Sequence, residues 1–133
     1  MAEDLTSVEA SGSFAAEPRA VSATRHMLAQ VLDDAGVGGE RRADALLVAS
    51  ELVANAIQHG SGSDDRIDVE VAVASRTLRI CVRDRARRRV APTTRVPHEH
   101  AQSGRGLQIV EALAEWSERT VAGHREVTAE LML

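Results

Sequence analysis

Apolar residues recur at helical spacing in three segments of the chain. The first two segments cover about 21–32 and 40–58, and the glycines within 36–39 separate them. A third helix is expected to begin at the glycines near 104–106 and could reach Trp116. In the second helix the expected core stripe consists of Ala43, Leu46, Leu47, Val53, Ala54 and Ile57. These patterns predict three amphipathic helices.

Elsewhere apolar and polar residues alternate, which is typical of half-buried strands. Alternation over 67–73 and 78–82 predicts two strands that pair as a hairpin through a short turn. Two further strands are expected near 119–122 and 127–133. The order of elements predicts an α+β two-layer sandwich, in which a mixed, mostly antiparallel sheet is covered on one face by three helices.

Two segments lack clear periodicity. Residues 1–18 are rich in Ala, Ser, Glu and Gly, and we expect a flexible tail that could end in an edge strand. The domain itself is then expected over 19–133. Residues 83–103 hold two prolines, a run of arginines and two histidines. A loop of this length in a small domain is uncommon and usually functional.

Composition excludes several kinds of site. All sixteen basic residues are arginine, so the chain offers neither a Schiff-base lysine nor a phosphate-loop lysine. The net charge of -4 and the presence of only two large rings, Phe14 and Trp116, argue against direct nucleic-acid binding. No segment has the features of a signal peptide or a membrane span, and Cys81 has no second cysteine to pair with. We therefore expect a bacterial cytoplasmic protein.

The second predicted helix carries the first candidate site. Glu51, Asn55 and His59 follow one another at spacings of four residues, so they share one strip, which we expect to flank the apolar stripe. By spacing alone they are ordinary polar boundary residues. The segment 46–60, LLVASELVANAIQHG, however, resembles the first nucleotide motif of the GHKL (histidine kinase-like) ATPases. The resemblance implies the Bergerat-type ATP-binding fold. It also implies that Asn55 binds Mg²⁺ bridging the phosphates of ATP and that Glu51 is the general base.

Two later motifs follow in the order of that family. Asp84 ends the strand LRICVRD, and the resemblance implies that it accepts a hydrogen bond from the adenine amino group. The segment SGRGLQIV resembles the second glycine box, in which Gly104, Arg105, Gly106 and Leu107 would surround the phosphates at a helix N-terminus.

The chain departs from the family pattern after Asp84, because the sequence DRARRR lacks both glycines of the usual Asp-x-Gly-x-Gly motif. The arginines there favour a solvated loop, with phosphate contact as the second reading and nucleic acid as the third. The segment 85–103 is interpreted as an ATP lid. The pattern His98-Glu99-His100 is a weak metal motif, and we assign these residues to the lid.

Three motifs in family order, without recognisable dimerisation or sensor segments, resemble most closely the anti-sigma serine/threonine kinases and related small actinobacterial regulatory ATPases. The resemblance implies an ATP-dependent protein kinase that phosphorylates an anti-anti-sigma partner, sequesters a sigma factor, or does both, and that could form a homodimer. The degraded motif after Asp84 leaves a second hypothesis open, a nucleotide-sensing or protein-binding module of the same fold without transferase activity.

Overall fold

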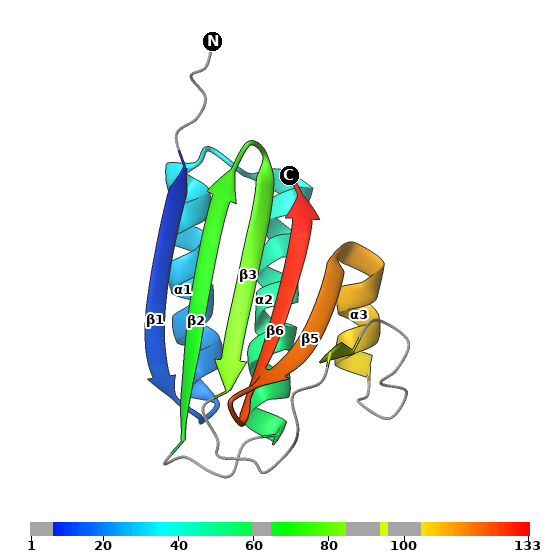
Figure 1. Ribbon diagram of the computed structural model, residues 1–133. Helices are drawn as coiled ribbons and strands as arrows, with labels where there is room; N and C mark the ends of the chain where they lie inside the picture. The colour runs from blue at the N-terminus through cyan, green and yellow to red at the C-terminus, as the bar shows by residue number, and fades with distance from the viewer. Residues whose placement is uncertain (1–6, 60–64, 85–93, 96–104) are drawn as a thin grey trace.

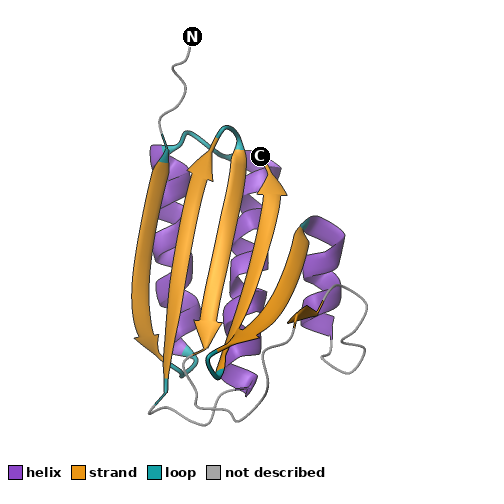
Figure 2. Ribbon diagram, viewed as in Figure 1, coloured by secondary structure: helices purple, strands orange, loops and turns teal. Residues whose placement is uncertain are grey.

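The computed structural model describes residues 7–59, 65–84, 94–95 and 105–133. One layer consists of three helices, α1 (Arg19–Asp34), α2 (Gly39–His59) and α3 (Arg105–Leu113). The other layer is a sheet of β1 (Val8–Ala15), β2 (Arg66–Ala74), β3 (Thr77–Asp84), β4 (Thr94–Arg95), β5 (Glu115–Val121) and β6 (His124–Met132). All three helices lie on one face of this sheet (Figures 1 and 2). The predicted α+β two-layer sandwich is therefore confirmed.

The strand order is β1-β2-β3-β6-β5-β4, and each pair of neighbouring strands is antiparallel. Alternate residues of the central strands are buried against the helices, as in β2, where Ile67, Val69, Val71 and Val73 all point to the covered face. The intervening residues form an open, polar face. A one-residue slip of any strand would move its apolar residues onto this open face, so the register is strongly specified.

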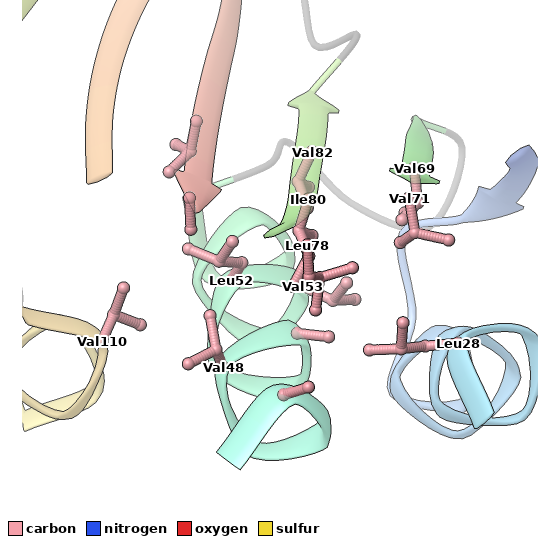
Figure 3. Close-up of a cluster of buried hydrophobic side chains, with 14 of the residues drawn as sticks. Leu28, Val48, Leu52, Val53, Val69, Val71, Leu78, Ile80, Val82 and Val110 are labelled. Carbon is pink, nitrogen blue, oxygen red and sulfur yellow. The ribbon is translucent and has the colours of Figure 1, made fainter. Parts of the chain in front are cut away.

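The core lies between the sheet and α1 and α2 (Figure 3). Leu28 enters it from α1, Leu52 from α2 and Val110 from α3, and none of the three is exposed to solvent. On α2 the buried residues are Ala45, Val48, Ala49, Leu52, Val53, Asn55 and Ala56. The predicted stripe on this helix was therefore largely wrong, since Leu47 is exposed and Leu46 and Ile57 are only partly buried. The helix is apolar on most of its circumference, and its packing decides which side is buried.

A Schellman motif ends α1. The N–H of Val37 donates to the carbonyl of Leu32 at 2.8 Å, and the N–H of Gly36 donates to the carbonyl of Asp33 at 3.1 Å. Gly36 adopts a φ of 74°, which glycine reaches without a steric penalty. The helix break expected at the glycines is thus explained, and α2 begins immediately afterwards.

The edge strand β1 lies within residues 1–18, which were expected to form a tail that could end in an edge strand. It pairs with β2 from Val8 opposite Val73 to Ala15 opposite Arg66. Its inward positions include Ala10 and Gly12, which are too small to give a strong alternating signal. A Cβ atom on Gly12 would lie 2.7 Å from the Phe14 ring, so the absence of a side chain makes room for that ring.

A second correction concerns Trp116. The third helix was expected to extend toward this residue, but α3 ends at Leu113 and β5 begins at Glu115. Along β5 the buried residues alternate, and Trp116, Glu118 and Thr120 all face the covered side. Two of these three are polar, so their alternation could not be recognised from hydrophobicity.

Candidate functional site

Asn55 is buried in the last third of α2, with only 5 % of its surface exposed. It lies on the inward side of the helix, one turn after Leu52, rather than at the flank of the apolar stripe. Its side-chain nitrogen Nδ2 is buried and has no hydrogen-bond partner among the described residues. A buried amide without a partner is unfavourable by about 1–3 kcal/mol. Such a group is expected where a ligand supplies the missing contact.

Glu51 lies one turn before Asn55 on the same strip of α2. Its side chain is partly buried, which keeps the carboxylate at the boundary of the packed helix. His59 is the last residue of α2, and its side chain lies outside what the structure describes.

Asp84 is the last residue of β3, and 1 % of its surface is exposed. It continues the buried series of that strand, so its carboxylate lies on the covered face of the sheet. The sequence predicts a carboxylate at the strand end, whereas the burial of this carboxylate results from the tertiary structure. Burying a carboxylate is unfavourable unless other groups interact with it.

The described candidate elements lie toward one end of the molecule. The strand β3 and the helix α2 both run toward the lower end in Figure 1, where Asp84 and the last turns of α2 are found. The first turn of α3, formed by Arg105, Gly106 and Leu107, faces the same way. The backbone N–H groups in the first turn of a helix have no partner within that helix. Since α3 packs against α2, these groups of α3 lie beside the helix that carries Asn55.

Other predicted features lie outside the described residues. They are Gly104, the side chains of residues 105–107, the histidines at 98 and 100, and the lid segment apart from β4. The strand β4 pairs with β5, with Arg95 opposite Glu118. Within the described residues no cluster of three or more His, Cys, Asp or Glu side chains could hold a metal ion.

A buried ion pair next to this end of the sheet was not predicted from the sequence. Arg125 of β6 donates from Nε to Glu118 Oε2 at 2.7 Å and from Nη2 to Glu118 Oε1 at 3.2 Å. Both residues are buried, with 6 % and 7 % of their surfaces exposed. The pair could have been predicted from two charged residues at inward positions of neighbouring strands. Because β5 was expected to begin only near residue 119, Glu118 was not assigned to an inward position of that strand.

The open face of the sheet has a separate set of charges. Glu126 accepts hydrogen bonds from Arg83 at 2.8 Å and from Arg119 at 2.7 Å. Burial alone would raise the pKa of Glu126, but the hydrogen bonds from Arg83 and Arg119 outweigh this effect and lower its pKa below the ordinary value of 4.5. Cys81 lies on the same face, and burial raises the pKa of its thiol. These groups are on the face opposite the candidate site.

Two hollows on the open face and one beside Val37 at the opposite end of the molecule are lined by described residues, and none of the three includes Glu51, Asn55 or Asp84. The candidate site is thus defined by buried polar residues at the sheet end rather than by one of these hollows.

Comparison with known families assigns the fold. Residues 14–130 match the model of the histidine kinase-like ATPase domain. The chain belongs to the histidine kinase-like ATPase family. Because the match runs from β1 to β6, it includes α2, β3 and α3, which carry the candidate residues. The family resemblance inferred from the three motifs is therefore confirmed.

A solved structure agrees with this assignment. The RsbU and RsbW domains of Rv1364c from Mycobacterium tuberculosis superpose with a TM-score of 0.71 at 26 % sequence identity. The alignment covers 94 % of this chain and 32 % of the other, so the chain spans about a third of that structure's length. No curated protein matches the sequence. Among the described helices, none is both long and apolar enough to cross a membrane.

Proposed function

We propose that this protein binds Mg·ATP at the end of the sheet and acts as a regulatory serine/threonine kinase. The observation that carries the proposal is the buried amide of Asn55, whose Nδ2 has no hydrogen-bond partner in the described structure. It lies in the ATPase-family helix, toward the same end as Asp84 and the start of α3. A phosphate-bearing ligand bound there satisfies a group that is otherwise costly to bury.

The residues assigned to nucleotide binding have the chemistry that magnesium and ATP require. The amide oxygen of Asn55 is a hard ligand of the kind that Mg²⁺ accepts, and Mg²⁺ commonly takes its remaining ligands from phosphates and water. The backbone N–H groups at the start of α3, with Gly104, Arg105, Gly106 and Leu107, are assigned to the phosphates. Asp84 is assigned to the adenine amino group, because an ionised carboxylate only accepts hydrogen bonds.

Glu51 is assigned the role of general base. It lies one turn from Asn55, which is proposed to hold Mg²⁺ on the phosphates. A hydroxyl that approaches the γ-phosphate would therefore lie near the carboxylate of Glu51. Phosphoryl transfer depends mainly on positioning and charge neutralisation, and a partly buried carboxylate can orient the attacking hydroxyl and take its proton.

The protein substrate is proposed from the family resemblance and the structural neighbour. The match to a structure containing an RsbW domain supports a place among the anti-sigma kinase-like proteins. We assign to this chain a serine or threonine of an anti-anti-sigma protein as substrate, a sigma factor as a second binding partner, and a cytoplasmic location. We also propose that the protein can form a homodimer and that it binds neither nucleic acid nor membrane directly.

Two measurements test the proposal. Calorimetry is expected to show Mg·ATP binding by the wild type and its loss in Asn55→Ala. Transfer of radioactive γ-phosphate to the anti-anti-sigma protein encoded nearest the gene is expected to fall by at least about 100-fold in Glu51→Gln, in line with the effect of a general base. Nucleotide binding should persist in that variant. Glu40→Gln changes an exposed carboxylate on the same helix and is the matched control. A wild type that binds no ATP contradicts the proposal.

The second candidate function is a nucleotide-sensing or protein-binding module without transferase activity. The motif DRARRR favours it, because both glycines that follow the aspartate in the family are replaced. Backbone approach to a base or phosphate is harder where side chains replace glycine. Mg·ATP binding combined with equal, background phosphate transfer by wild type and Glu51→Gln would support this second function.

A further inference from the structure

A guanidinium group lies buried directly beside the proposed base-binding aspartate. Asp84 of β3 and Arg125 of β6 are register partners in the antiparallel pair. Side chains of residues that lie opposite each other in such a pair have Cβ atoms about 4.5–5.5 Å apart. Both residues lie on the covered face, with 1 % and 6 % of their surfaces exposed. A hydrogen-bond acceptor and a donor are thus placed next to each other at this sheet end.

The described residues satisfy the hydrogen-bonding groups of Arg125 only in part. Its Nε and Nη2 donate to the two carboxylate oxygens of Glu118, at 2.7 and 3.2 Å. Its third nitrogen, Nη1, is buried without a hydrogen-bond partner among the described residues. A two-point contact with a carboxylate holds the planar guanidinium in a fixed orientation. Glu118 therefore keeps Nη1 in one place, whereas a single ion pair would let the group rotate.

We propose that Arg125 is a specificity-determining residue that donates a hydrogen bond from Nη1 to a ring nitrogen of the bound purine. This inference rests on the proposed ATP binding, and it adds a contact beyond the one assigned to Asp84. In adenine the amino group is flanked by the ring nitrogens N1 and N7, which are both acceptors. Together the two side chains match one edge of the base: the carboxylate accepts a hydrogen bond from the amino group, and the guanidinium donates one to an adjacent ring nitrogen.

A purely structural ion pair is the competing explanation. Arg125 and Glu118 belong to neighbouring strands, and their contact would hold β5 to β6 whether or not a nucleotide is bound. Such a pair, however, does not require Nη1 to be buried without a partner. An unsatisfied buried N–H of a charged group is unfavourable, and a base acceptor removes that penalty. The two explanations differ in whether removing one ring nitrogen from the nucleotide changes its affinity.

The test compares ATP with two analogues in which a single ring nitrogen is replaced by CH, 1-deaza-ATP and 7-deaza-ATP. Calorimetry with magnesium is expected to show that one of the two binds the wild type at least about 10-fold more weakly than ATP, as befits a hydrogen bond from a charged donor. The double variant Arg125→Met/Glu118→Gln removes both charges of the pair. In this variant the ratio of the Kd of the weaker analogue to the Kd of ATP should fall to about one. Arg125→Met alone, which also lacks the donor, serves in its place if the double variant does not fold.

Arg119→Met is the matched control, because Arg119 also belongs to β5 but binds Glu126 on the open face. It should keep the wild-type ratio. Equal binding of all three nucleotides by the wild type overturns the inference, and so does a ratio that persists after Arg125 is replaced. A wild type that binds no Mg·ATP removes the proposed function as well. A wild type that binds ATP and both analogues equally removes only the role of Arg125.

Discussion

Replacing Asn55 with alanine should weaken function without weakening the fold. The variant removes a buried N–H that has no partner in the described structure, which relieves a penalty of about 1–3 kcal/mol. Alanine is also the better helix former, by up to about 0.7 kcal/mol. Against this, the lost side-chain atoms leave a small cavity, for which we estimate about 0.5–1 kcal/mol from its volume. The expected change in the free energy of unfolding lies between zero and a gain of about 3 kcal/mol.

The ligand response should change in the opposite direction. Saturating the wild type with Mg·ATP at about 100 times its Kd should add about 2.7 kcal/mol to its stability. For a chain of this size, about 1 kcal/mol corresponds to roughly 4 °C in Tm, so the wild-type Tm should rise by about 10 °C. Asn55→Ala should show no rise in Tm with Mg·ATP. Its Tm without ligand should equal that of the wild type or exceed it by up to about 12 °C.

Thermal unfolding followed by circular dichroism, with and without Mg·ATP, measures both quantities. Gln58→Ala is the control, because Gln58 is exposed near the same end of α2. Its stability should stay within about 0.5 kcal/mol of the wild type, and its response to ATP should be intact. A loss of more than about 1 kcal/mol in ligand-free Asn55→Ala would refute the reasoning, since Asn55 would then stabilise the fold through contacts of its own.

Three further predictions concern the rest of the molecule. Because the pKa of Glu126 is lowered in the folded protein by Arg83 and Arg119, its contribution to stability is present above the unfolded pKa near 4.5 and is lost as the pH falls through the lower folded value. Urea titrations below about pH 4.5 should show a steeper loss for wild type than for Glu126→Gln; parallel curves would contradict this assignment. Since burial raises the pKa of the Cys81 thiol, alkylation by iodoacetamide should be at least about tenfold slower in the native state than in urea, and equal rates would show that Cys81 is accessible. Deleting residues 1–16 removes β1 and exposes the edge of β2, so it should lower Tm and promote aggregation; an unchanged Tm and unchanged light scattering during heating would contradict this.

Much of the fold could be read from one-dimensional patterns. Apolar residues at every second position from Ile67 to Val73 predicted a strand that is buried on one side, because successive side chains of a strand point to opposite faces of the sheet. The Gly36 break between α1 and α2 was equally clear, since a positive φ there favours glycine. Segments with a weak hydrophobic contrast were predicted less completely. For β1, with its small inward side chains, only a possible edge strand at the end of a tail was expected. For β5, whose inward positions include Glu118 and Thr120, the expected start was too late.

For the candidate site, the sequence by itself determined which residue types stand at which spacing. The strip with Glu51 and Asn55 and the strand end at Asp84 led to the family that the comparison confirmed. The tertiary structure alone decided that Asn55 is buried and not at the flank of its helix, because the side of α2 that faces the sheet depends on contacts with β3, α1 and α3. It alone also placed Arg125 opposite Asp84, since the register of β3 and β6 joins residues 41 positions apart in the chain. Spacing along a sequence reports which residues share one helix or strand, whereas burial and cross-strand pairing depend on how separate elements pack together.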